Sequence, residues 1–125
     1  MARNSELPIL DPATLEQLQE LIDGNDTSFL TDLFESYLST AKDSIDLLRG
    51  EVDQDVLRRA AHTLKGSSLN VGASRVADLC KRLESQLRAE PPPDMPAQVD
   101  QIEIRVQQVH DSYAAAITEM ATAAR

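Results

Sequence analysis

Apolar residues recur at steps of three and four along most of the 125-residue chain, and the runs are separated by Gly, Asp and Pro. This spacing is typical of helices that bury one face, and we find neither a strand-like alternation of any length nor an internal repeat. The breaks between runs are short, so neighbouring helices are expected to run antiparallel. The pattern therefore predicts an all-α fold. We expect an antiparallel up-down four-helix bundle with a short extra N-terminal helix over residues 11–125, after a flexible N-terminal tail over residues 1–10.

Capping residues predict where the helices begin and end. Asp, Asn and Ser side chains accept backbone N–H groups at helix N-termini, and glycine adopts the left-handed conformation that often ends a helix. The expected starts are Asp11 with Pro12 as the first helical residue, Asn25 or Asp26, Asp53, and Ser74, and the expected ends are Gly24, Gly50 and Gly72. The run from Pro91 to Pro93, with Pro96, is expected to form a stiff break before the last helix.

Composition limits the residue types available for the core and the cellular compartments that suit the chain. Aromatic residues make up only 3% of the chain and Trp is absent, so the core must be aliphatic. The single cysteine, Cys80, excludes an intramolecular disulfide and lies on an inward stripe, where we expect a small core residue. No apolar run approaches the roughly 18 residues of a membrane span, and the N-terminus does not resemble a signal peptide. We expect a cytoplasmic domain that does not contact the membrane.

Several polar side chains are expected at the surface without a functional role. Tyr37 and Tyr113 are expected to cover the edges of the core with their hydroxyl groups in water. Glu84 has the helical spacing to pair with Arg88 or Lys81, and such surface pairs contribute little to stability.

Charge is distributed unevenly along the chain. The net charge is −9, which argues against nonspecific nucleic-acid binding. Residues 1–53 hold 3 basic and 12 acidic residues, whereas residues 54–82 hold 6 basic and 2 acidic residues. The basic stretch is either a solvated helix face, which is the commoner case, or a surface that meets an acidic partner.

The basic stretch contains an exposed histidine. Helical residues are separated by about 100°, so His62 lies about 140° and Gly66 about 180° from Leu57 on the buried face. Both positions therefore face solvent. Gly in an exposed helix interior costs about 1 kcal/mol relative to Ala, and here it leaves open the space one turn from the imidazole. This departure from helix preference is typical of functional sites, although a close helix contact is the structural alternative.

An exposed imidazole next to cations is suited to carry a phosphoryl group. Imidazole is nucleophilic near neutral pH, and a phosphoryl group on its ring nitrogen would bring negative charge and acceptor oxygens. Lys65, one turn after His62, and Arg58, one turn before it, can pair with those oxygens. Each residue alone is more often an ordinary solvated side chain, and it is the combination that favours a site.

The stretch AHTLKGSSLNVGA, residues 61–73, resembles the signature of histidine-containing phosphotransfer (HPt) domains of multistep phosphorelays. The following helix, ASRVADLCKRLE, and the earlier stretches LDPATLEQLQEL and DTSFLTDLFESYL also resemble that family. The similarity covers roughly residues 10–90, and the last helix matches only in its pattern.

The resemblance implies a phosphotransfer intermediate and not an enzyme. His62 would accept a phosphoryl group from the aspartyl phosphate of a receiver domain and pass it to another receiver, Lys65 would stabilise the phosphoryl oxygens, and Gly66 would leave room for the receiver's loops. The partner would be the receiver domain of a response regulator or a hybrid histidine kinase. That partner would supply the catalytic groups and Mg²⁺, so we expect neither a cofactor nor a metal site in this chain.

The resemblance also bears on the surroundings of the histidine. Ser67 and Ser68 match small residues of the family that pack and sometimes form hydrogen bonds, and we assign Ser68, with Arg58 and Leu69, to the surface that docks the receiver. Leu69 departs from the family, which more often has a small residue there. Its position in line with His62 suggests an apolar docking contact, and packing against the first short helix is the alternative.

Other functions fit less well. The dimerising bundle of histidine kinases has an acidic residue after its histidine and then Arg-Thr-Pro, whereas Thr63 follows His62 and no proline is near. A di-iron bundle needs Glu-x-x-His pairs, which are absent, and His110 is expected to be a boundary residue. A helical-bundle adaptor that binds a receiver or kinase domain without being phosphorylated remains as the alternative. We expect a monomer, and the sequence suits a freestanding protein or a fragment of a hybrid kinase equally.

Overall fold

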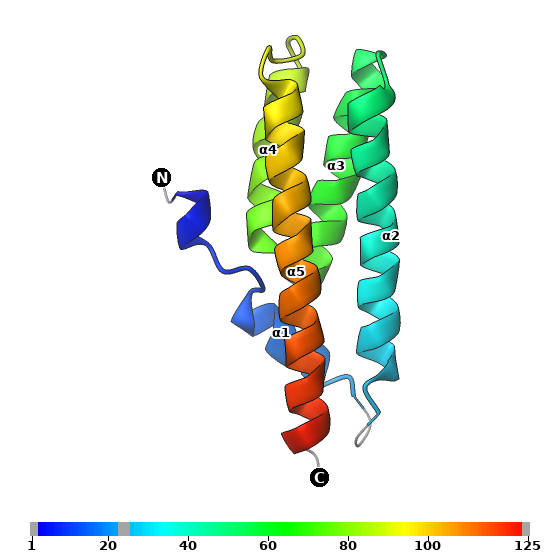
Figure 1. The fold of residues 1–125 in the computed structure, drawn as a ribbon, viewed down its shortest axis with the longest axis vertical. Coiled ribbons are helices and arrows are strands. Elements are labelled where there is room, and N and C mark those ends of the chain that lie inside the picture. The colour runs from blue at the N-terminus through cyan, green and yellow to red at the C-terminus, as the bar shows by residue number, and fades with distance from the viewer. Residues whose placement is uncertain (1–2, 23–25, 124–125) are drawn as a thin grey trace.

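The computed structural model describes residues 3–22 and 26–123, and all regular structure within these ranges is helical. The elements are η1 (Asn4–Glu6), α1 (Pro12–Gln19), α2 (Ser28–Gly50), α3 (Gln54–Val71), α4 (Ser74–Leu87) and α5 (Met95–Ala123). Helices α2 to α5 run side by side in alternating directions, and α1 lies near one end of α3 (Figure 1). The predicted all-α bundle of four antiparallel helices with a short extra N-terminal helix is confirmed. Among the described residues, no helix is both long and apolar enough to span a bilayer.

Helix α3, which carries the histidine, has both of its predicted caps. The Asp53 carboxylate accepts the backbone N–H groups of Asp55 at 2.9 Å and Val56 at 3.3 Å, which the first turn of a helix leaves without partners. Gly72 follows the last helical residue with φ +78°, and a Cβ there would also lie 3.0 Å from the Cβ of Thr14. The backbone N–H of Asp11 donates to the carbonyl of Gly72 at 2.7 Å, so the end of α3 anchors the start of α1.

Three boundaries differ from the predictions. Helix α1 ends at Gln19, earlier than expected, and the expected end at Gly24 and cap at Asn25 lie outside the described residues. Asp26 does accept the backbone N–H of Ser28 at 2.9 Å, although Thr27 is the N-cap residue. Pro96 lies inside the first turn of α5 and not in the break before it, because the first turn of a helix needs no N–H donor.

The core is mainly aliphatic but also contains Phe34, Tyr37 and Tyr113, and Cys80 is fully buried within it. The two tyrosines are more deeply buried than expected, so the prediction of hydroxyl groups in water was wrong. The Tyr113 ring stacks on Phe34 with centroids 4.1 Å apart, and its hydroxyl donates to the carbonyl of Thr31 at 3.3 Å. The Tyr37 hydroxyl is hydrogen-bonded to Ser68 Oγ at 2.9 Å.

The described part of the expected tail, residues 3–10, is attached to the bundle. Arg75 on α4 donates from Nε to the carbonyl of Leu7 at 2.7 Å, and Asn4 donates to the carbonyl of Arg75 at 2.9 Å. Ile9 and Leu10 pack against the core. These contacts differ from the loose segment expected from the sequence, whereas the domain boundary at residue 11 stays a prediction.

Candidate functional site

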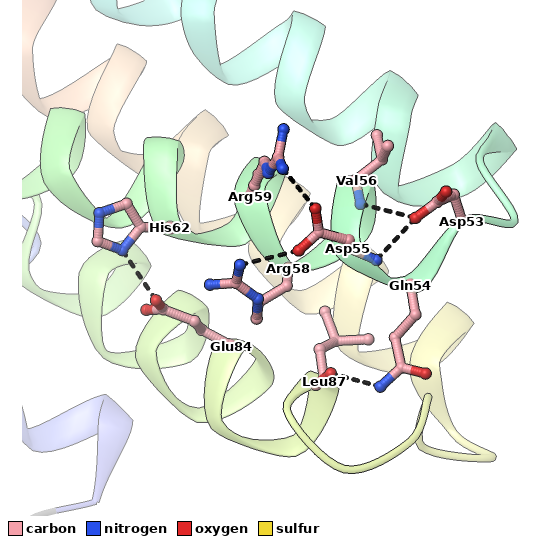
Figure 2. Close-up of polar contacts among 9 residues, drawn as sticks. All are labelled: Asp53, Gln54, Asp55, Val56, Arg58, Arg59, His62, Glu84 and Leu87. Atoms are coloured by element: carbon pink, nitrogen blue, oxygen red, sulfur yellow. Dashed lines mark hydrogen bonds and ion pairs between the residues drawn. The ribbon is translucent and has the colours of Figure 1, made fainter.

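His62 lies near the middle of α3 with 64% of its side chain exposed, as the helical angles predict. Its ring points toward α4, and Figure 2 shows its contact with Glu84 of that helix. Lys65 follows one turn later and reaches the same carboxylate, with 25% of its side chain exposed. The imidazole is therefore accessible from solvent on one side and held by the protein on the other.

Glu84 joins the two predicted site residues. Its Oε1 is 2.8 Å from His62 Nδ1, and its Oε2 is 2.6 Å from Lys65 Nζ. The Glu84 side chain is only 5% exposed, so these two contacts replace the hydrogen bonds to water that an exposed carboxylate would form. An ionised carboxylate only accepts hydrogen bonds, and Nδ1 therefore carries the ring proton. The lone pair of the neutral imidazole is then on Nε2.

The charge of Glu84 is set by two opposing effects. Burial alone would raise the pKa of its carboxyl group, because a low-dielectric environment penalises the charged form. The hydrogen bonds from Lys65 and His62, together with their charges, outweigh burial and lower the pKa below its usual value of 4.5. Glu84 is thus ionised at neutral pH, which is the state required for holding the proton on Nδ1.

The other predicted site residues differ in their accessibility. A Cβ at Gly66 would meet no atom within 4 Å, so the surface beside the histidine is open and the close-contact alternative for Gly66 does not hold. Leu69 is 61% exposed, which argues against packing under α1. Arg58 Nη2 donates to Asp55 Oδ1 at 2.9 Å and its side chain remains partly exposed.

Ser68 does not lie on the surface of the protein. It is fully buried on the core side of α3, and its hydroxyl is hydrogen-bonded to that of Tyr37. A partner cannot reach this side chain, so its assignment to the docking surface was wrong. Burial raises the pKa of Tyr37, so this hydroxyl stays protonated and the pair links α2 to α3. The packing and hydrogen-bonding role implied by the family resemblance is the one that fits.

Sequence reasoning missed the part that Glu84 plays, since surface pairs with Arg88 or Lys81 were expected. One signal was present. Glu84 lies four residues after Cys80 and next to Leu83 on the inward stripe of α4, where a carboxylate needs a partner. The identity of that partner depends on how α4 lies against α3, which periodicity does not specify.

The second histidine has ordinary surroundings. His110 is exposed on α5, and its only side-chain hydrogen bonds and ion pairs among the described residues are with Asp111 and Gln107. No group of three or more potential metal ligands occurs in residues 3–22 and 26–123. His62 is thus the histidine whose environment is organised by buried groups.

Comparisons with known proteins give one family match and two similar proteins. Residues 11–112 match the model of the family described as Hpt domain. The sensor protein TorS of Escherichia coli (strain K12) is 36% identical over 61 residues, which are 49% of this chain and 7% of the length of that protein. The crystal structure of histidine-containing phosphotransfer protein B (HptB) from Pseudomonas aeruginosa PAO1 has a TM-score of 0.78 and 27% identity, covering 90% of this chain and 96% of that one.

Proposed function

This chain belongs to the Hpt domain family, and we propose that His62 is the residue on which it carries the phosphoryl group. Hpt domains are phosphotransfer intermediates of two-component phosphorelays, not catalytic enzymes, and they relay phosphate with receiver domains. The observation that supports His62 is the Glu84 contact, which fixes the ring of an exposed histidine with Nε2 toward solvent.

The reaction at His62 balances without a further reactant. The Nε2 lone pair attacks the phosphorus of an aspartyl phosphate, the N–P bond forms, and the P–O bond to the aspartate breaks with its electrons returning to the carboxylate. Nδ1 keeps its proton, which Glu84 holds throughout. The positive charge that develops on the ring faces the carboxylate of Glu84, so the charge is stabilised where it appears.

Lys65 and Gly66 complete the proposed site. The ammonium group of Lys65 is one turn from the imidazole and has three N–H donors, of which one is used by Glu84. The remaining donors are available for phosphoryl oxygens. The open surface at Gly66 leaves room for the loops of the receiver that surround its aspartate.

We further propose a partner, a docking surface and a cellular setting for this domain. The partner is the receiver domain of a response regulator or hybrid histidine kinase, and it supplies the acidic pocket and Mg²⁺. Arg58 and Leu69 take part in docking, the protein is a cytoplasmic monomer, and it binds neither nucleic acid nor membrane. The exposure of both side chains supports the docking role, and the net charge of −9 argues against nucleic acid.

The test follows phosphate from a receiver domain onto this chain. Purified protein is mixed with a phosphorylated receiver domain and Mg²⁺, with His62→Gln and His110→Gln alongside. The wild type and His110→Gln should become labelled and His62→Gln should not. The label should be labile to acid and stable to base, as a phosphoramidate is.

Labelling of His62→Gln would contradict the proposal. An adaptor that is not phosphorylated is the alternative function, and it predicts a different outcome. It would bind the receiver with similar affinity in the wild type and in His62→Gln, without transfer to either.

A further inference from the structure

A hollow of about 320 Å³ lies between the start of α3 and the end of α4, one helical turn from the histidine. Its lining residues are Gln54, Asp55, Arg58, Leu87 and Arg88. Arg58 precedes His62 by four residues, and Arg88, the C-cap residue of the antiparallel helix α4, follows Glu84 by four residues. Both arginines are therefore displaced from the phosphorylation site in the same direction along the bundle.

The walls of the hollow are fixed by hydrogen bonds. Gln54 Nε2 donates to the carbonyl of Leu87 at 2.6 Å and to that of Ala89 at 3.0 Å, so the two residues that flank Arg88 are held against α3. Figure 2 shows the Gln54–Leu87 contact on one side of this region and the Asp55–Arg58 contact on the other. The backbone that carries Arg88 is thus positioned before any partner arrives.

The charge of the hollow is opposite to that of the protein. Asp55 is the only acidic residue among the described residues that line the hollow, and it pairs with Arg58 at 2.9 Å and with Arg59 at 2.6 Å. Within the described residues, the guanidinium group of Arg88 has no hydrogen bond or ion pair. Arginines therefore outnumber the carboxylate on a protein whose net charge is −9. A basic site on an acidic protein selects acidic partners and repels basic ones.

We propose that the Arg58–Arg88 hollow receives an acidic side chain from the surface of the receiver domain and thereby orients the receiver on His62. This inference rests on the proposed function and deepens it, because the hollow discriminates between receiver domains by the charge of the side chain that docks there. Arg58 and Arg88 are positioning residues in this proposal. They hold the partner, and the phosphoryl group moves between His62 and the receiver's aspartate one turn away.

The test measures phosphotransfer from a receiver domain that labels the wild-type protein, over a range of receiver and salt concentrations. Arg58→Ala and Arg88→Ala should each lower kcat/KM by about twofold to fivefold, with the loss in KM and not in the maximal single-turnover rate. The dependence of kcat/KM on ionic strength should also become shallower, because salt screens the lost contact.

The matched control is Arg82→Ala. Arg82 is an exposed arginine of α4 that pairs with Asp78 outside the hollow, so its loss makes the same change in net charge. The proposal is overturned if kcat/KM of Arg58→Ala and Arg88→Ala equals that of Arg82→Ala at every salt concentration. It is also overturned if their maximal single-turnover rate falls while KM is unchanged. Failure of the wild type to accept phosphate from any receiver would instead contradict the function proposed for His62.

Discussion

Glu84 comes 22 residues after His62 and lies on the next helix, yet its carboxylate is 2.8 Å from the Nδ1 atom of the histidine. The contact exists because α3 and α4 pack closely as antiparallel neighbours. It gives the exposed ring a fixed orientation and a fixed tautomer. It also couples the histidine to Lys65, which binds the other oxygen of the same carboxylate.

Replacing Glu84 should slow phosphotransfer, because His62 would no longer be held in the tautomer with its proton on Nδ1. Glu84→Ala removes the acceptor that keeps the proton on Nδ1, and we expect the rate of phosphate acceptance to fall by about tenfold or more. The free energy of unfolding should fall by about 1.5–3 kcal/mol, because hydrogen bonds to a charged group are lost. Glu84→Gln keeps an acceptor and should retain more activity. Rates equal to wild type in Glu84→Ala would show that the contact does not position His62.

The free energy of unfolding should depend on pH through the ionisation of Glu84. Its pKa in the folded protein lies below the usual 4.5, so its contribution to stability is complete above that pH and is lost as pH falls through the lowered value. In urea titrations at decreasing pH, the wild type should lose stability more steeply than Glu84→Gln. Exposed acids with lowered pKa values, such as Asp55 and Asp111, are common to both proteins and cancel in the comparison. Parallel curves for the two proteins would contradict the assignment.

Substitutions at Gly66 should separate stability from transfer. A side chain there meets open space, so Gly66→Ala should raise the free energy of unfolding by up to about 1 kcal/mol. Gly66→Gln should also be stable but should lower kcat/KM for the receiver by about tenfold or more, because the longer side chain displaces the partner. Thermal melts and transfer assays on the same samples provide the check. Undiminished transfer in Gly66→Gln would mean that the receiver does not approach this surface.

Leu69 should contribute to binding without contributing to folding. Its side chain is 61% exposed, so Leu69→Ala should change the free energy of unfolding by no more than about 0.5 kcal/mol. Receiver binding should weaken by about tenfold if the leucine is buried in the complex. Ile104→Ala, at another exposed apolar residue on α5, is the control and should bind as wild type does. A large loss of thermal stability in Leu69→Ala would show that the leucine packs within the bundle.

The sequence by itself determined the helices and the exposure of the histidine. Helix periodicity and caps act within one or two turns, so Asp53, Gly72 and the angular position of His62 are readable from neighbours in the chain. Segments outside the helices are less determined by their neighbours in the chain. The start of α1 is held by the hydrogen bond from Asp11 to Gly72 at the end of α3. Residues 3–10 are attached through contacts with Arg75 on α4.

Only the tertiary structure decided which side chains meet across helices. Glu84 and Ser68 were both assigned to the surface, but the packing of the bundle places Glu84 beneath His62 and Lys65, and Ser68 against Tyr37. The physical reason is that a helical pattern specifies the buried face, whereas the axial register and rotation of one helix against another come from the packing of all side chains at the contact. That register determines which side chains lie close enough to a buried polar group to form hydrogen bonds with it. The histidine was therefore predictable, and the groups that hold it were not.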